Sequence, residues 1–138
     1  QHIIFALNKV DALDEEKGEH AKHYVSLAST YLAGLGYANA KIIPLMAQSA
    51  LIAKKSLSQV DLGRAERNIL RTELERFRER PFHFNRAAAI PHVMKKNVRK
   101  KLARISKGKV TAMSKEELNT FVDYTGLGTL NALIMGVA

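Results

Sequence analysis

The hydrophobic pattern opens with two short, nearly uninterrupted apolar runs, at residues 1–7 and 41–47. Runs of this length without polar alternation are typical of strands buried on both faces of a parallel sheet. Pro44 should lie near the end of the second strand, because proline has no N–H to donate to the ladder. The stretch between the runs is long enough for a right-handed crossover, so the pattern predicts a strand–helix–strand unit.

The connecting stretch has the spacing of a helix. Its apolar residues recur with a helical period up to Gly34 and Gly36, which should end a helix of about five turns. These residues are Tyr24, Leu27, Ala28, Tyr31 and Leu32. The acidic residues before them lie where they would complement the positive end of the helix dipole. They are Asp14, Glu15, Glu16 and Glu19.

The pattern beyond the second strand is helical throughout. An apolar stripe predicts a helix over residues 62–80 that Pro81 closes, and Pro91 opens a further helix that ends near Gly108. No internal repeat or low-complexity linker separates these helices.

Two short helices are predicted at the end of the chain. Ser114 and Glu117 have the spacing of a reciprocal capping box for a helix that runs through Val122, and Thr125 should cap a last helix over residues 127–135. We therefore expect a helix-dominated α/β fold with two parallel strands and about five helices.

Composition narrows the class of protein. The chain has 138 residues, 46% of them hydrophobic and 25% charged, which is typical of a folded globular domain and not of a disordered chain. The apolar runs are much shorter than the roughly 20 residues that cross a bilayer, and no signal-peptide pattern is present. The lack of cysteine excludes disulfides and thiolate chemistry. We expect a cytoplasmic protein.

Because the first strand starts at Gln1 without an initiator Met, we also expect a piece of a longer parent protein.

The net charge of +9 is unevenly distributed. Residues 54–109 carry 17 basic and 5 acidic residues, whereas the rest of the chain carries 5 basic and 8 acidic residues. An excess of this size in one segment suggests an anionic partner there.

The strongest chemical signal is Asn8-Lys9-Val10-Asp11, directly after the first predicted strand. Open α/β sheets bind ligands at the carboxyl ends of their strands. There the Asp11 carboxylate can accept two hydrogen bonds from the N1 and N2 edge of guanine, a pair of donors that adenine lacks. Asn8 would support the loop and the base edge, while the stem of Lys9 would lie along the ring. The alternative is an Asn–Asp turn that only caps the following helix.

A second segment carries Met46-Ala47 at the end of the second predicted strand. With the first motif it resembles the fourth and fifth conserved motifs of the G domain of regulatory GTPases, Asn-Lys-x-Asp and a strand ending in Ser-Ala. The resemblance implies that the backbone around Ala47 contacts the guanine oxygen. Met46 stands where the family usually has Ser, so the support that the Ser side chain gives the loop is missing. The alternative is a buried strand end followed by a helix start.

The tail adds a third point of resemblance. Thr125-Gly126-Leu127, with Leu130 three residues on, is similar to the opening of the last G-domain helix in dynamin-like large GTPases; the alternative is an ordinary capped amphipathic helix. The resemblance implies the C-terminal half of a parallel-sheet G domain that binds GTP or GDP. Residues 1–53 would carry the guanine motifs, residues 54–113 a basic helical insert and residues 114–138 the terminal helices. Dynamin-like proteins commonly remodel membranes. The resemblance therefore also implies an anionic membrane surface, or a second copy of the protein, as a partner.

The sequence lacks a Gly-x-x-x-x-Gly-Lys-Ser/Thr loop, which cradles phosphates and holds Mg²⁺. The resemblance places that loop, and with it Mg²⁺, upstream of Gln1 in the parent protein. We therefore expect guanine binding but no GTP hydrolysis by this chain alone, and we assign no catalytic and no metal-ligating residue.

A basic helix offers a different function. The cations after Met94 surround the apolar stripe of Val98, Leu102 and Ile105 without one acidic residue. The candidate anion-binding residues are Lys95, Lys96, Arg99, Lys100, Lys101 and Arg104. Such a helix suits a non-enzymatic module that binds anionic lipid or nucleic acid, the latter with less support because few aromatic residues lie nearby. The alternative is a helix that packs its stripe on the domain and leaves its cations in solvent.

Overall fold

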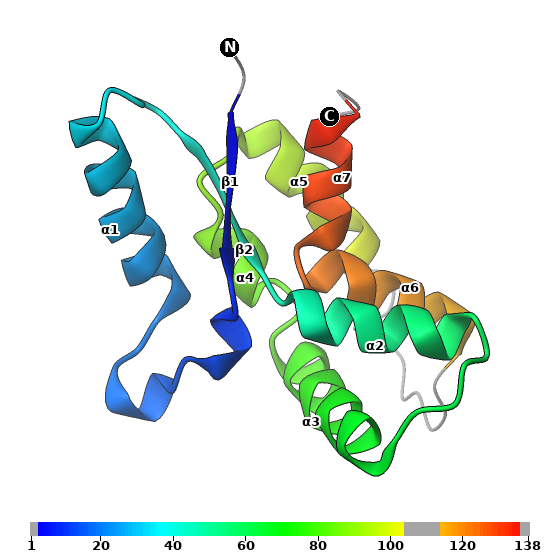
Figure 1. Ribbon diagram of the computed structural model, residues 1–138. Coiled ribbons are helices and arrows are strands. Elements are labelled where there is room, and N and C mark those ends of the chain that lie inside the picture. Colours follow the sequence, from blue (N-terminus) through cyan, green and yellow to red (C-terminus); the bar gives the residue numbers. More distant parts are fainter. Residues whose placement is uncertain (1–2, 104–113, 136–138) are drawn as a thin grey trace.

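The computed structural model describes residues 3–103 and 114–135 (Figure 1). Strand β1 (Ile4–Asn8) leads through the 3-10 turns η1 (Val10–Ala12) and η2 (Glu15–Lys17) into helix α1 (Ala21–Gly34) and strand β2 (Lys41–Leu45). Six further helices follow: α2 (Ala47–Leu57), α3 (Arg64–Glu79), α4 (His83–Ala87), α5 (His92–Ala103), α6 (Lys115–Tyr124) and α7 (Leu127–Ile134).

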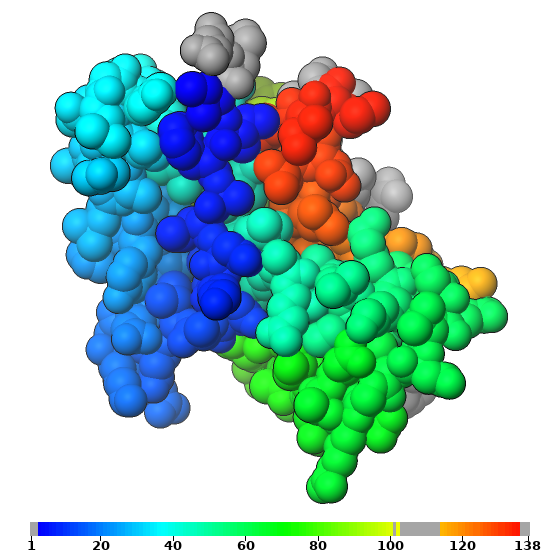
Figure 2. All heavy atoms as spheres, viewed as in Figure 1, coloured from blue at the N-terminus to red at the C-terminus, as the bar shows by residue number. Residues whose placement is uncertain are grey.

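The two strands form a parallel pair, as predicted. Ile4 lies opposite Lys41 and Asn8 opposite Leu45. Pro44 is the last residue but one of β2, where the loss of one N–H interrupts the ladder least. β2 is buried along most of its length, but β1 is half-exposed, so the expectation of a strand buried on both faces is wrong for β1. In Figure 2, β1 lies on the visible surface between α1 and α7.

The described part of the chain has seven α-helices where the pattern predicted about five. The helical stretch after β2 is divided into α2 and α3, and the short helix α4 was not predicted. The acidic cluster also has another place than expected, because α1 begins only at Ala21. Asp14 instead caps η2 by accepting a hydrogen bond from the Glu16 N–H.

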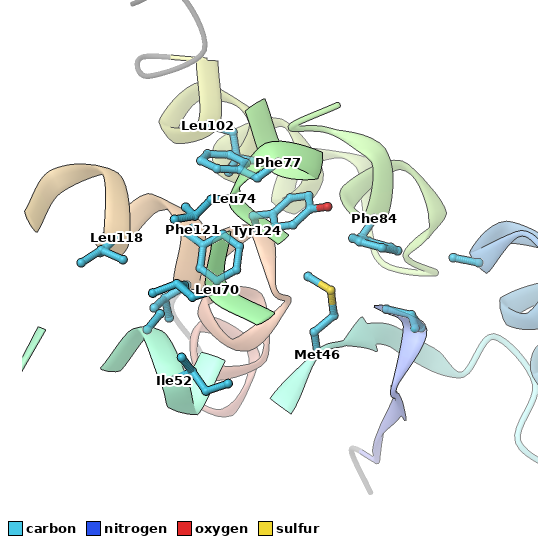
Figure 3. Packing of buried hydrophobic residues seen from close by; sticks show 14 of the residues in the cluster. Met46, Ile52, Leu70, Leu74, Phe77, Phe84, Leu102, Leu118, Phe121 and Tyr124 are labelled. Atoms are coloured by element: carbon cyan, nitrogen blue, oxygen red, sulfur yellow. The ribbon is translucent and has the colours of Figure 1, made fainter. Parts of the chain in front are cut away.

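One hydrophobic cluster joins most of the elements (Figure 3). Its centre is aromatic: the ring of Tyr124 lies 5.0 Å from that of Phe77, 5.4 Å from that of Phe84 and 5.7 Å from that of Phe121, measured between centroids. Met46, at the end of β2, is fully buried in the same cluster. α3, α4 and α6 therefore pack together with the end of the sheet. No helix of the described ranges is long and apolar enough to span a membrane.

The turn between α6 and α7 packs directly on the end of β2. The Thr125 carbonyl accepts a hydrogen bond from the Met46 N–H at 2.9 Å. Gly126 has a left-handed backbone with φ of 92°, and a β-carbon there would lie 2.1 Å from the Pro44 carbonyl oxygen. The N-cap of α7 is Gly126 and Thr125 ends α6, so the prediction that Thr125 caps the last helix is wrong by one residue; the Thr125 hydroxyl still accepts a long hydrogen bond, 3.4 Å, from the Leu127 N–H. The tail segment thus holds the loop that follows β2.

The predicted capping box at α6 is half-formed. The Ser114 hydroxyl accepts a hydrogen bond from the Glu117 N–H at 3.1 Å, but the Glu117 carboxylate does not return to the helix start. It is buried, and it accepts a hydrogen bond from Arg78 Nε on α3 at 2.8 Å. A long-range ion pair therefore replaces the predicted local hydrogen bond.

Candidate guanine-recognition site

The parallel strands bring the two guanine motifs to one edge of the sheet. Because Asn8 and Leu45 are register partners at the ends of β1 and β2, the loops that follow them leave the sheet side by side. This is the carboxyl edge, where open α/β sheets bind their ligands. The two motifs are far apart in the sequence but lie next to each other in the structure.

A direct hydrogen bond joins the two loops. The Asn8 side-chain carbonyl accepts from the backbone N–H of Ala47 at 3.0 Å. Asn8 thus supports the second loop, while its predicted contact with the base edge stays a prediction. The Ala47 N–H, in the backbone segment expected to contact the guanine oxygen, is therefore already hydrogen-bonded to Asn8. The neighbouring N–H groups of Gln48 and Ser49, in the first turn of α2, have no hydrogen-bond partner among the residues described.

The loop after β1 presents its polar residues outward. Lys9 has a left-handed backbone with φ of 65°, an uncommon conformation for a residue with a side chain, and it is exposed. Val10 anchors the loop, since only 2% of it is exposed. The half-exposed Asp11 carboxylate accepts no hydrogen bond and forms no ion pair within the described residues. It is therefore available to a ligand.

Helix α3 also holds this loop, through a contact that the sequence pattern does not reveal. Arg76 donates one hydrogen bond to the Asp11 carbonyl at 3.1 Å and another to the Glu73 carboxylate at 3.0 Å. Burial raises the pKa of Glu73, although Arg76 opposes the shift, and the negative charge of Asp11 raises it further. The only local signal for this pair was its i,i+3 spacing on the helix, which does not reveal the distant carbonyl.

A second set of contacts holds the chain just beyond this loop. Glu15 pairs with Arg80 at 2.5 Å and with His83. Burial alone would raise the pKa of Glu15, but the hydrogen bond from Arg80 and the charge of His83 lower it overall. The end of α3 and the start of α4 thus clamp η2, so the segment from residue 9 to residue 17 is attached to the helices at two places.

The candidate anion-binding residues of α5 are only partly available. Lys95 is half-buried and donates a hydrogen bond to the Arg86 carbonyl at 3.2 Å, and Arg99 is half-buried too. Lys96 and Lys100 are exposed. The side chain of Lys101 and the whole of Arg104 lie outside the described residues.

The apolar stripe of α5 faces the protein. Leu102 is fully buried, Met94 is buried and Val98 packs against the same core cluster. This arrangement matches the alternative in which α5 is a structural helix. The described stripe is therefore covered by protein and does not offer an apolar face to lipid.

The described residues contain no group of three or more His, Asp or Glu side chains that could hold a metal ion. The sequence contains no Gly-x-x-x-x-Gly-Lys-Ser/Thr loop, so the Mg²⁺ expected for a longer parent stays a prediction. Comparison with protein families, curated proteins and solved structures finds no match for this chain.

Proposed function

We propose that this chain is the base-recognition part of a guanine-nucleotide-binding protein, with Asp11 as the residue that selects guanine. The observation that carries the proposal is the hydrogen bond from the Ala47 N–H to Asn8, which joins the loops of the two motifs at the carboxyl edge of the sheet. The finer resemblance to dynamin-like GTPases, and GTP hydrolysis by a longer parent, belong to the same proposal.

The chemistry of selection follows from the free carboxylate. Two acceptor oxygens on Asp11 complement the N1–H and the N2 amino group of guanine, whereas adenine would leave the carboxylate unpaired. The hydrogen bond from Arg76 to the Asp11 carbonyl holds the backbone of this loop, which reduces the entropy lost on binding. Lys9, exposed beside it, supplies a stem for the face of the base.

The test uses nucleosides, so that contacts with phosphate do not enter. Guanosine and xanthosine are titrated against the labelled chain and followed by NMR chemical shifts. Base contacts alone predict weak binding, about millimolar, with guanosine preferred. Asp11→Asn should reverse the preference by about tenfold or more, because the amide can donate to the xanthine carbonyl that replaces the N2 amino group.

Asp61→Asn is the matched control, since Asp61 is exposed in the connection between α2 and α3 and the same charge is removed there. It should leave the preference for guanosine unchanged. Equal affinities of the Asp11→Asn variant and the wild type for both nucleosides would contradict the proposal.

The second candidate is a binding module for anionic lipid through α5. It rests on the exposed Lys96 and Lys100, and the burial of the apolar stripe leaves it electrostatic only. Co-sedimentation with anionic vesicles that falls with rising salt, and that is lost in the Lys96→Glu, Lys100→Glu variant, would favour it.

A further inference from the structure

A cavity of 820 Å³ lies between the start of α1 and the junction of α3 with α4. Sites for small molecules usually occupy about 300–1,000 Å³, so the cavity has the size of a ligand site. None of the residues proposed to recognise guanine lines it. Its ionisable lining is mainly basic: His20, Lys22, His23, Arg80, His83 and Arg86.

The charges of this lining do not cancel. Glu79 is its single acidic residue among those described. Arg80 and His83 are paired with Glu15. Lys22 and Arg86 are exposed and form no ion pair within the described part of the chain, so two cations on different helices remain uncompensated.

A third cation lies next to Arg86. Lys95 donates its hydrogen bond to the Arg86 carbonyl, and burial lowers its pKa, as do the charges of Arg99 and Lys22. The helix start at the cavity adds to the positive potential. His20 precedes α1 without a side-chain cap, and the N–H groups of Ala21 and Lys22 have no partner among the described residues.

We propose that this cavity binds a small ligand that carries two or more phosphate groups. Guanidinium, ammonium and helix-start N–H groups are the donors that proteins use for phosphate. Because Lys22 on α1 and Arg86 on α4 both line the cavity, a ligand with more than one anionic group can pair with both, and the volume exceeds that of a single phosphate. A soluble polyphosphate and the headgroup of a phosphoinositide share this chemistry.

Calorimetric titration of the whole chain with tripolyphosphate tests the site. The Lys22→Gln, Arg86→Gln variant should bind at least about tenfold more weakly, because each lost cation removes a charge-assisted hydrogen bond. Glu79→Gln should bind several-fold more tightly, because it removes the carboxylate that repels the ligand. A merely structural role of these residues would not produce a gain in affinity.

The matched control is Lys96→Gln, Lys100→Gln, which removes the same charge from exposed positions of α5 outside the cavity. It should keep most of the wild-type affinity. Binding to vesicles that contain phosphatidylinositol 4,5-bisphosphate, without binding of tripolyphosphate but with the same order of variants, would identify the headgroup as the ligand. Equal losses in both double variants, or no binding of either probe, would overturn the proposal. The nucleoside test of Asp11 is independent of every one of these outcomes.

Discussion

At position 126 the turn between α6 and α7 has room only for a hydrogen atom. Gly126→Ala would place a β-carbon 2.1 Å from the Pro44 carbonyl and keep a left-handed backbone. Strain and overpacking together should lower the free energy of unfolding by about 3 kcal/mol. Urea denaturation followed by circular dichroism measures this loss.

Gly18 supplies the matched control at the same scale. It also has a left-handed backbone, with φ of 80°, but a β-carbon there would meet nothing within 4 Å. Gly18→Ala should therefore cost only the backbone strain, about 1 kcal/mol. Similar losses in the two variants would show that the contact with Pro44 does not limit the turn.

Between elements, the clamp of Glu15, Arg80 and His83 should make stability depend on pH. Burial lowers the pKa of His83; the charge of Glu15 opposes this shift, while Arg80 and Arg76 add to it. The unfolded chain, with a histidine pKa of about 6.5, then takes up the proton before the folded chain does. Stability should fall as the pH drops from about 6.5 to the lower pKa of the folded state.

His83→Gln should remove this part of the pH dependence. Urea midpoints at pH 7.5 and pH 5.5 measure it, and the difference between them should be smaller for the variant than for the wild type. An unchanged difference would mean that the neutral form of His83 is not favoured in the folded protein.

For α5, the structure predicts that the apolar stripe supports the fold. Leu102 is fully buried, so Leu102→Ala should lower the free energy of unfolding by about 3 kcal/mol. Val93 on the same helix is 65% exposed, and Val93→Ala should change it by less than about 0.5 kcal/mol. Chemical denaturation compares the two variants. If both variants lowered the free energy of unfolding by less than about 0.5 kcal/mol, the apolar stripe would not support the fold.

For the whole molecule, the features predicted from the sequence are those that depend on local pattern. The apolar runs and Pro44 predicted a parallel pair whose second strand ends just beyond that proline, and the spacing of Ser114 and Glu117 predicted the Ser114 cap of α6. The two motifs that resemble a G domain meet through Asn8 and Ala47. Whether they bind guanine stays a prediction.

The features that the sequence did not reveal depend on contacts between distant residues. An apolar run looks the same whether neighbouring elements cover it, as for β2, or leave it half-exposed, as for β1. Glu117 has the spacing of a local cap, yet Arg78 on another helix takes its carboxylate. Similarly, nothing near Asp11 in the sequence indicates that Arg76 holds its carbonyl.

The hydrogen bond from Met46 to Thr125 has a consequence for the order of folding. It joins residues far apart in the sequence, and Phe121 and Tyr124 complete the aromatic centre only when that distance is closed. Closing so long a loop costs entropy before the contacts compensate it. During synthesis on the ribosome, Phe77 and Phe84 should therefore remain uncovered until α6 has emerged, and this is the interval in which the nascent chain most needs a chaperone.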